Sequence, residues 1–236
     1  MPGKIYANLK GKTALITGAS SGIGAALARR LAAHGVNVVC TARTQSNLDS
    51  VAKSITDAGG SALAFAADAT VSEDTEKLAQ AIEAEYGGLD LAYLNAGGNW
   101  QKASIEDSDI REWREAVNQN LLSVFLGVRL AAPLMRINGG GQIILTGSAM
   151  AHYPAPGNSS YCAGKSAARM VANIAALELV DDNIRVNEFI PGPVRSKQAL
   201  HGLTKEDKNS PFNNSKEWIK EPEDVTEMLL FMAAYP

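Results

Sequence analysis

The chain has 236 residues, of which 46% are hydrophobic and 20% charged, and these values suit one α/β domain with a sizeable core. A net charge of −3 excludes the strongly basic surface that nucleic acid or an anionic membrane attracts. We expect no signal segment and no membrane span. The two cysteines, Cys40 and Cys162, are expected to be free thiols in a cytoplasmic setting.

Apolar runs alternate with amphipathic stretches in the first half of the chain. The apolar runs predict buried strands over 13–16, 37–41, 61–67 and 89–94. The stretches between them predict helices over 25–34, 45–58 and 72–86. Thr44 is the expected N-cap of the second helix, and Gly87 ends the third.

The second half continues the alternation with longer helices. Strands are predicted over 142–146 and 184–189, and helices over 108–138, 158–179 and 222–234. The polar segment 195–220 breaks the pattern, and we predict that it is a mobile flap beside a substrate site.

Strands that alternate with helices in this way predict an α/β fold with a doubly wound, mostly parallel sheet. Six strands are readable, right-handed crossovers place helices on both faces, and residues 1–236 form a single domain. In such sheets ligands bind outside the carboxyl ends of the strands, where the strand order reverses.

The first strand runs into the stretch Thr17-Gly18-Ala19-Ser20-Ser21-Gly22-Ile23-Gly24, which opens the first helix. Glycines let the backbone approach a ligand closely, and a helix N-terminus offers free N–H groups to a pyrophosphate. An ordinary tight turn between strand and helix is the alternative interpretation.

Several further motifs follow this stretch in a fixed order: Asp68, Asn95-Ala96-Gly97, Asn120, Ser148, Tyr161-Cys162-Ala163-Gly164-Lys165 and Pro191-Gly192. Together they resemble the single-domain main branch of the short-chain dehydrogenase/reductase family over nearly the whole chain. The resemblance implies one NAD(P)-binding Rossmann domain and an oxidoreductase. It also implies a homodimer or homotetramer, although the chain supplies no seventh strand of the kind the family normally has.

The resemblance assigns roles by position. It implies that the catalytic residues are Asn120, Ser148, Tyr161 and Lys165. It implies that the cofactor-binding residues are Gly18, Ser20, Ser21, Gly22, Ile23, Gly24, Asp68, Asn95, Ala96, Gly97, Tyr161, Lys165, Pro191, Gly192 and Val194. In the family the lysine also binds the nicotinamide ribose, the asparagine holds a relay water, and the aspartate binds the adenine amino group.

Tyr161 fits the proton donor that carbonyl reduction requires. A phenol has a pKa of about 10, and Lys165 lies one helical turn further on, so we expect its charge, together with the positive nicotinamide of the oxidised cofactor, to lower that pKa. Ser148 is expected to hydrogen-bond the substrate oxygen and orient it. Asn120 has a structural alternative, as a polar residue that bends a long helix.

The end of the second strand bears on the choice of cofactor. Ala42 stands where NAD users of the family carry an acidic residue, and Arg43 suits a 2′-phosphate, so NADP(H) is expected and NAD(H) remains an alternative. Arg43 could instead be a solvated surface residue. Ser196 is expected to contact the cofactor carboxamide, and no residue spacing indicates a metal site.

We therefore expect an NADP(H)-dependent oxidoreductase that interconverts a small-molecule carbonyl and an alcohol. The alternatives are an NAD-preferring dehydrogenase of the same family and a nucleotide-sensing protein without turnover. Trp100, Gln101, His152 and Tyr153 are kept as pocket lining, and the substrate itself cannot be read from the sequence.

Overall fold

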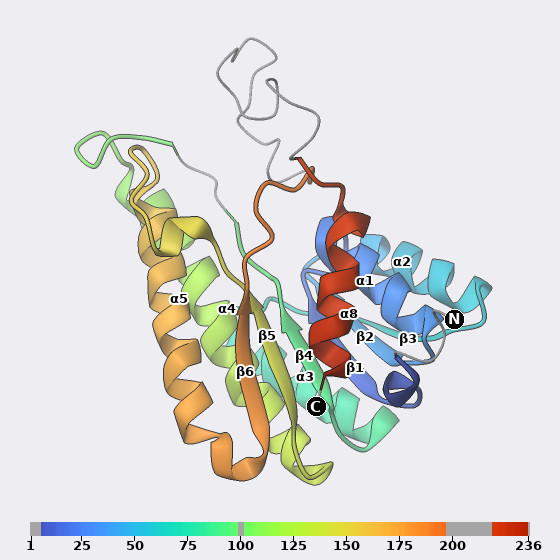
Figure 1. The fold of residues 1–236 in the computed structure, drawn as a ribbon. Coiled ribbons are helices and arrows are strands. Elements are labelled where there is room, and N and C mark those ends of the chain that lie inside the picture. Colours follow the sequence, from blue (N-terminus) through green and yellow to red (C-terminus); the bar gives the residue numbers. More distant parts are fainter. Residues whose placement is uncertain (1–5, 99–101, 197–218, 236) are drawn as a thin grey trace.

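A computed structural model describes residues 6–98, 102–196 and 219–235. Its centre is a six-stranded sheet in the order β3-β2-β1-β4-β5-β6, in which every neighbouring pair is parallel (Figure 1). The strands are β1 (Thr13–Thr17), β2 (Asn37–Ala42), β3 (Ser61–Ala66), β4 (Leu91–Leu94), β5 (Gly141–Thr146) and β6 (Ile184–Phe189). The doubly wound α/β fold is confirmed.

Helices cover both faces of the sheet, as right-handed crossovers require (Figure 1). One face carries α1 (Gly22–Ala33), α2 (Gln45–Asp57) and α8 (Thr226–Ala234). The other carries α3 (Ser72–Tyr86), α4 (Ile110–Ile137) and α5 (Ser159–Glu178). Short 3-10 helices are η2 (Ala7–Leu9), η3 (Ala149–Ala151), η4 (Val180–Asp182) and η5 (Pro222–Val225).

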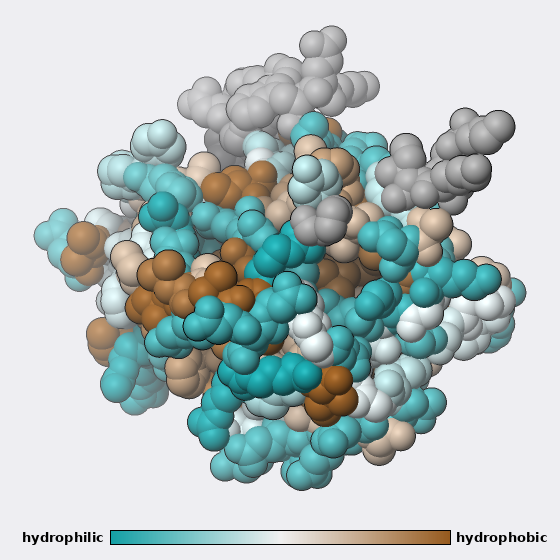
Figure 2. Space-filling view, turned by 60° about the horizontal axis from the view of Figure 1, so that its bottom comes forward, coloured by the Kyte–Doolittle hydropathy of each residue, from teal (hydrophilic) through white to brown (hydrophobic). Residues whose placement is uncertain are grey.

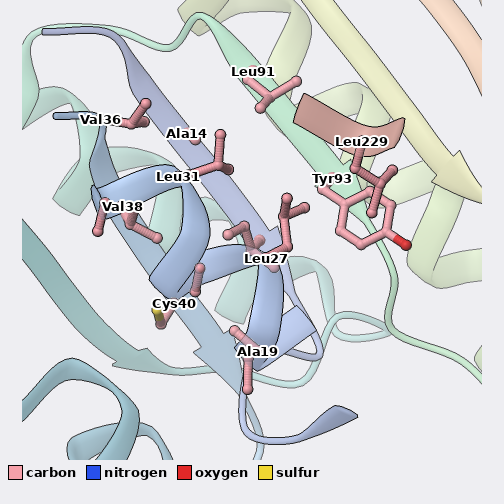
Figure 3. Close-up of a cluster of buried hydrophobic side chains, with 14 of the residues drawn as sticks. Ala14, Ala19, Leu27, Leu31, Val36, Val38, Cys40, Leu91, Tyr93 and Leu229 are labelled. Atoms are coloured by element: carbon pink, nitrogen blue, oxygen red, sulfur yellow. The ribbon is translucent and has the colours of Figure 1, made fainter. Parts of the chain in front are cut away.

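Each face of the sheet has its own hydrophobic core, because strand side chains alternate between the two faces. Figure 3 shows Leu27 and Leu31 of α1 packed over the strands, and Leu229 of α8 beside Tyr93 of β4. Burial of all five residues of β1 explains why the three at its centre are all apolar rather than alternating with polar residues.

Helix boundaries follow local chemistry. The carboxylate of Asp109 accepts hydrogen bonds from the Arg111 and Glu112 amides, so α4 begins at Ile110. Gly87 ends α3 in the left-handed conformation with φ of 77°. Thr44 occupies the N-cap position of α2, as predicted, but its side chain makes no capping hydrogen bond.

By length and composition alone, α4 is apolar enough to cross a membrane, and it is the one such helix in the described part of the chain. More than half of its most apolar window is buried against the sheet and its neighbouring helices. Its hydrophobicity is therefore that of a core helix in this fold.

The strand order reverses between β1 and β4, and there the two carboxyl ends are joined. The hydroxyl of Thr17, the last residue of β1, accepts hydrogen bonds from the amides of Asn95 and Ala96, both at 2.9 Å. This junction fixes the crevice in which open α/β sheets bind ligands.

The predicted flap, residues 195–220, lies largely outside the described residues. Its two described ends are joined, since Val194 and Lys220 form a parallel bridge and the Arg195 amide donates to the Lys220 carbonyl at 2.8 Å. An ion pair between Arg195 and Glu221, also at 2.8 Å, reinforces the junction.

Candidate active site

The glycine turn after β1 has the backbone that its sequence predicts. Gly18 and Gly22 have φ of 66° and 55°, a region that other residues rarely adopt. A Cβ at Gly24 would lie 2.5 Å from the Gly18 carbonyl oxygen, so only glycine lets the turn close on α1. Ser21 makes no side-chain capping bond, which leaves the first N–H groups of α1 open to an anion.

A cleft of about 430 Å³ extends from this turn along the carboxyl ends of the strands. Its predicted lining residues are Gly18, Ser20, Ser21, Gly22, Ile23, Arg43, Asn95, Ala96, Gly97, Tyr161, Lys165 and Ser196. The remaining lining residues are Thr17, Thr41, Ala42, Thr44, Ala67, Ala69, Gly98, Gln119 and Thr146. Within the described residues, the lining contains two cations, Arg43 and Lys165, and no carboxylate.

The cleft also contains an unsatisfied polar atom. The hydroxyl of Thr41 is buried and has no hydrogen-bond partner among the described residues. Buried hydroxyls are normally hydrogen-bonded, so an unpaired one in a cleft wall indicates a ligand surface. With the glycine turn and the open helix terminus, it fits a bound dinucleotide.

Asn95 and Asn120 hold the floor of the cleft in shape. The Asn95 side chain donates to the Thr17 carbonyl at 3.3 Å. Fully buried Asn120 donates to the carbonyls of Gly98 and Ala116 at 2.7 and 2.8 Å, and accepts from the Gly98 amide at 3.1 Å. Asn120 therefore positions the loop after β4, in addition to any part it takes in a proton relay.

Ser148 does not line the cleft, but its side chain is hydrogen-bonded to Tyr161, which does. Ser148 caps η3 by accepting from the Met150 amide at 3.1 Å. Without a cofactor, burial raises the pKa of Tyr161 above the ordinary 10.0, although the Ser148 hydrogen bond lowers it in part. The lowering expected from Lys165 together with an oxidised nicotinamide stays a prediction.

The ammonium of Lys165 lies 5.8 Å from the centroid of the Tyr161 ring and donates to the Thr146 carbonyl at 2.7 Å. The residue is only 5% exposed. Burial lowers the Lys165 pKa from 10.5 to about 8, and the negative charge of Glu188 opposes this change. Thus α5 places Tyr161 and Lys165 on one face, as their spacing predicts.

Some predicted residues lie outside the cleft wall: Gly24, Asp68, Asn120, Ser148, Pro191, Gly192 and Val194. Asp68 accepts from the amide and hydroxyl of Thr70 at 2.9 and 2.7 Å, while its neighbours Ala67 and Ala69 line the cleft. Trp100 and Gln101 lie outside the described residues. His152 and Tyr153 are described, and neither lines the cleft.

Sequence reasoning missed Thr41, Gln119 and Thr146, which line the cleft without belonging to a motif. The Thr146 hydroxyl is hydrogen-bonded with that of Tyr93 at 2.7 Å and lies 3.0 Å from the Asn95 amide oxygen. Its position as the last residue of β5 is the one signal that could have found it. No His, Cys, Asp and Glu cluster suited to a metal occurs among the described residues.

Fold and cleft together define an NAD(P)-binding Rossmann protein of the oxidoreductase class. The family model described as short chain dehydrogenase matches residues 12–207. The chain therefore belongs to the short-chain dehydrogenase/reductase family, and it is an NAD(P)-dependent enzyme that acts on CH–OH groups or their carbonyl counterparts.

Two similar relatives have assigned activities. A 2,5-dichloro-2,5-cyclohexadiene-1,4-diol dehydrogenase of Sphingobium indicum is 35% identical over 96% of this chain and 90% of its own. A 3beta-hydroxysteroid dehydrogenase of Eggerthella lenta is also 35% identical, over 97% of this chain and 82% of its own.

Solved structures agree with this assignment. A short-chain dehydrogenase/reductase of Mycobacterium marinum has a TM-score of 0.88 at 32% identity and covers 97% of this chain and 92% of its own. A metagenomic short-chain oxidoreductase in complex with NADP has a TM-score of 0.81 at 30% identity, and the match covers 97% of this chain and 92% of that one. A 3-ketoacyl-(acyl-carrier-protein) reductase of Brucella melitensis complexed with NADH has a TM-score of 0.84 at 30% identity, and the match covers 95% of this chain and 91% of that one.

Proposed function

We propose that the protein is an NADP(H)-dependent oxidoreductase that interconverts a carbonyl and an alcohol, with Tyr161 as the acid and base. The observation that carries the cofactor preference is the charge of the described cleft lining, which has Arg43 at one end, Lys165 at the other and no carboxylate. An acidic residue that would hold a 2′-hydroxyl is missing from the end of β2, where Ala42 and Arg43 stand.

Arg43 is free to bind a phosphate. It is exposed, and the structure shows no hydrogen bond or ion pair from it to any described residue. A guanidinium holds a phosphate through paired, charge-assisted hydrogen bonds. Binding the 2′-phosphate would therefore not require Arg43 to give up another partner.

The proposed hydride and proton transfers take place at the end of the cleft that Tyr161 and Lys165 line. A bound nicotinamide supplies or accepts the hydride. The raised pKa of Tyr161 keeps its hydroxyl protonated near neutral pH, so Tyr161 donates its proton to the carbonyl oxygen during reduction. In the opposite direction the hydroxyl must first lose that proton, so alcohol oxidation should accelerate as pH rises above neutral. Ser148 orients the substrate oxygen.

Replacing Arg43 with Ala tests the cofactor preference. We expect the Kd for NADPH, measured by fluorescence titration, to rise about 10- to 100-fold, because one charge-assisted contact is lost. The Kd for NADH should change little. Arg111→Ala, which removes an exposed arginine outside the cleft lining, is the matched control. An equal loss of both cofactors would refute the NADP assignment.

Tyr161→Phe tests the acid and base. Turnover in a ketone and alcohol panel, followed by NADPH absorbance, should fall about 100-fold or more, while NADPH binding stays within a few-fold. The panel includes cyclic diols and hydroxysteroids, since relatives carry those names. Tyr153→Phe, at an exposed tyrosine, is the control. Unchanged turnover in Tyr161→Phe would exclude Tyr161 as the acid; no turnover in the wild type would favour a nucleotide-sensing protein.

We further propose that copies of the chain associate through α4 and α5. Met170, Ile174 and Leu177 of α5 and Phe125 of α4 are large apolar side chains exposed to solvent. Figure 2 shows hydrophobic side chains gathered on the left of the molecule, the side on which α4 and α5 lie in Figure 1. Light scattering after size exclusion should give a dimer or tetramer, and a monomer at micromolar concentration would contradict this.

A cytoplasmic location is proposed on the state of the cysteines. Both are free, and Cys40 is buried in the core beside α1 (Figure 3). Burial raises the pKa of the Cys40 thiol to about 12, so it is unreactive. Free thiols are typical of a reducing compartment, and cell fractionation with an antibody would test the location.

A further inference from the structure

Glu188 is a charged residue of β6 that belongs to none of the sequence motifs described above. In the register of the sheet it pairs with Leu145 of β5, and its side chain faces α5. One carboxylate oxygen, Oε2, lies 3.4 Å from His152 Nε2 and 3.7 Å from Arg169 Nε. The other, Oε1, is buried and has no hydrogen-bond partner among the described residues.

The backbone beside Ser148 makes room for this carboxylate. A Cβ at Gly147 would overlap Oε1, Cγ and Cδ of Glu188, so a glycine at that position is needed for the glutamate to fit. Gly147 is also tied to β6, because its amide donates to the Phe189 carbonyl at 2.8 Å. The Glu188 carboxylate thus lies against the link between the end of β5 and Ser148.

The same carboxylate faces the charged row of α5. Tyr161, Lys165 and Arg169 follow one another at intervals of one turn, so they share a helix face. Lys165 donates to the carbonyl of Thr146, which pairs with Phe189, the residue after Glu188. The negative charge of Glu188 raises the pKa of Lys165 against the effect of burial.

The groups around Lys165 come from four elements. Tyr161 and Arg169 lie on its own helix, Glu188 on β6, His152 at the end of η3, and Tyr93 on β4 touches Thr146. Among these described groups Glu188 is the one carboxylate. It is therefore the anion that can balance a buried ammonium at this site.

We propose that Glu188 is a positioning residue for catalysis: its partly buried carboxylate lies against Gly147, faces the row of Tyr161, Lys165 and Arg169 on α5, and serves as the counter-charge of the Lys165 ammonium. Arg169 and His152 hold one carboxylate oxygen, and the space at Gly147 admits the other. The kinetic part of this inference rests on the proposed function, since it concerns the proton donor of that reaction; the electrostatic part does not.

Glu188→Gln removes the charge and keeps the shape. In protein labelled with ¹³C-lysine, the Lys165 side-chain signal is assigned by its loss in Lys165→Met and titrated by NMR. We expect the Lys165 pKa in Glu188→Gln to be about 1 pH unit lower than in the wild type. Arg169→Met, which removes a neighbouring positive charge, should move it in the opposite direction. An unchanged Lys165 pKa in Glu188→Gln would overturn the proposal.

Glu188→Asp is the second variant, because it retains the charge at shorter reach and should restore most of the wild-type pKa. In kinetics, the alkaline limb of the kcat/KM profile for reduction should move about 1 pH unit lower in Glu188→Gln, and a purely structural role would leave its position unchanged. The NMR titration needs no turnover. Failure of the proposed function would appear as an inactive wild type, and failure of this inference as an unmoved Lys165 titration.

Discussion

At the scale of single residues, burial of the Lys165 ammonium in the site lowers the stability of the folded protein. The Lys165 pKa of about 8 in the folded protein lies below the ordinary 10.5, so between these values the unfolded chain binds more protons. Stability should therefore rise as pH increases from 8 to 10.5. Below pH 8 the cost of burying the ammonium is fully present.

Lys165→Met removes this titration and keeps most of the side-chain volume. Urea unfolding at several pH values should show that the variant's advantage over the wild type shrinks as pH rises through 8 to 10, because the wild type loses its buried charge there. Lys53→Met, at an exposed lysine on α2, is the control and should follow the wild-type curve. Parallel pH dependences for Lys165→Met and wild type would contradict the buried-charge account.

The residue scale also marks the limits of sequence reasoning. The spacing of Tyr161 and Lys165 placed both on one helix face, because an i, i+4 pair is local. The acceptor of the Lys165 hydrogen bond, the Thr146 carbonyl, belongs to a strand 19 residues earlier and could not be inferred from spacing.

At the scale of elements, the geometry at the strand ends explains which of the predicted cofactor-binding residues line the cleft. Past β3 the chain enters a turn, in which the Val71 amide donates to the Asp68 carbonyl at 3.0 Å. Ala67 and Ala69 line the cleft, while Asp68 between them bonds to Thr70. The sequence pattern placed Asp68 at the correct strand end, and only the three-dimensional arrangement showed its direction.

Capping at the start of α4 gives a test at this scale. Asp109→Ala removes the acceptor for two backbone amides, and we expect a loss of about 1 kcal/mol of unfolding free energy, measured in urea. Asp109→Asn retains a capping oxygen and should lose only a few tenths of a kcal/mol. Equal losses for the two variants would indicate that charge, rather than the capping oxygen, stabilises this helix end.

At the scale of the whole molecule, the fold was predictable because the alternation of strands and helices, together with crossover handedness, restricts the topology strongly. The packing of α8 on the face that carries α1 and α2 was not predictable, since the sequence of a short apolar helix does not indicate where the helix packs. Leu229 of α8 lies in the core with Leu91 and Tyr93 of β4 (Figure 3).

Leu229→Ala should therefore destabilise the entire domain by about 2–5 kcal/mol, the usual cost of emptying a buried leucine site. The neighbouring Met228 is exposed, and Met228→Ala should stay within about 0.5 kcal/mol of the wild type. Thermal and urea unfolding both measure the difference. A small effect at Leu229 would mean that α8 can detach without loosening the sheet.

The bridge between Val194 and Lys220 has a practical consequence for engineering. Arg195 and Lys220 are hydrogen-bonded to each other, and Ser196, the residue after Arg195, lies in the cleft wall. Since the closure entropy of a loop grows slowly with its length, the stretch between could be exchanged for segments of other lengths at little thermodynamic expense. If segment 195–220 is the predicted substrate flap, libraries grafted between these two residues should change the substrate preference, and a ketone and alcohol panel would measure the change.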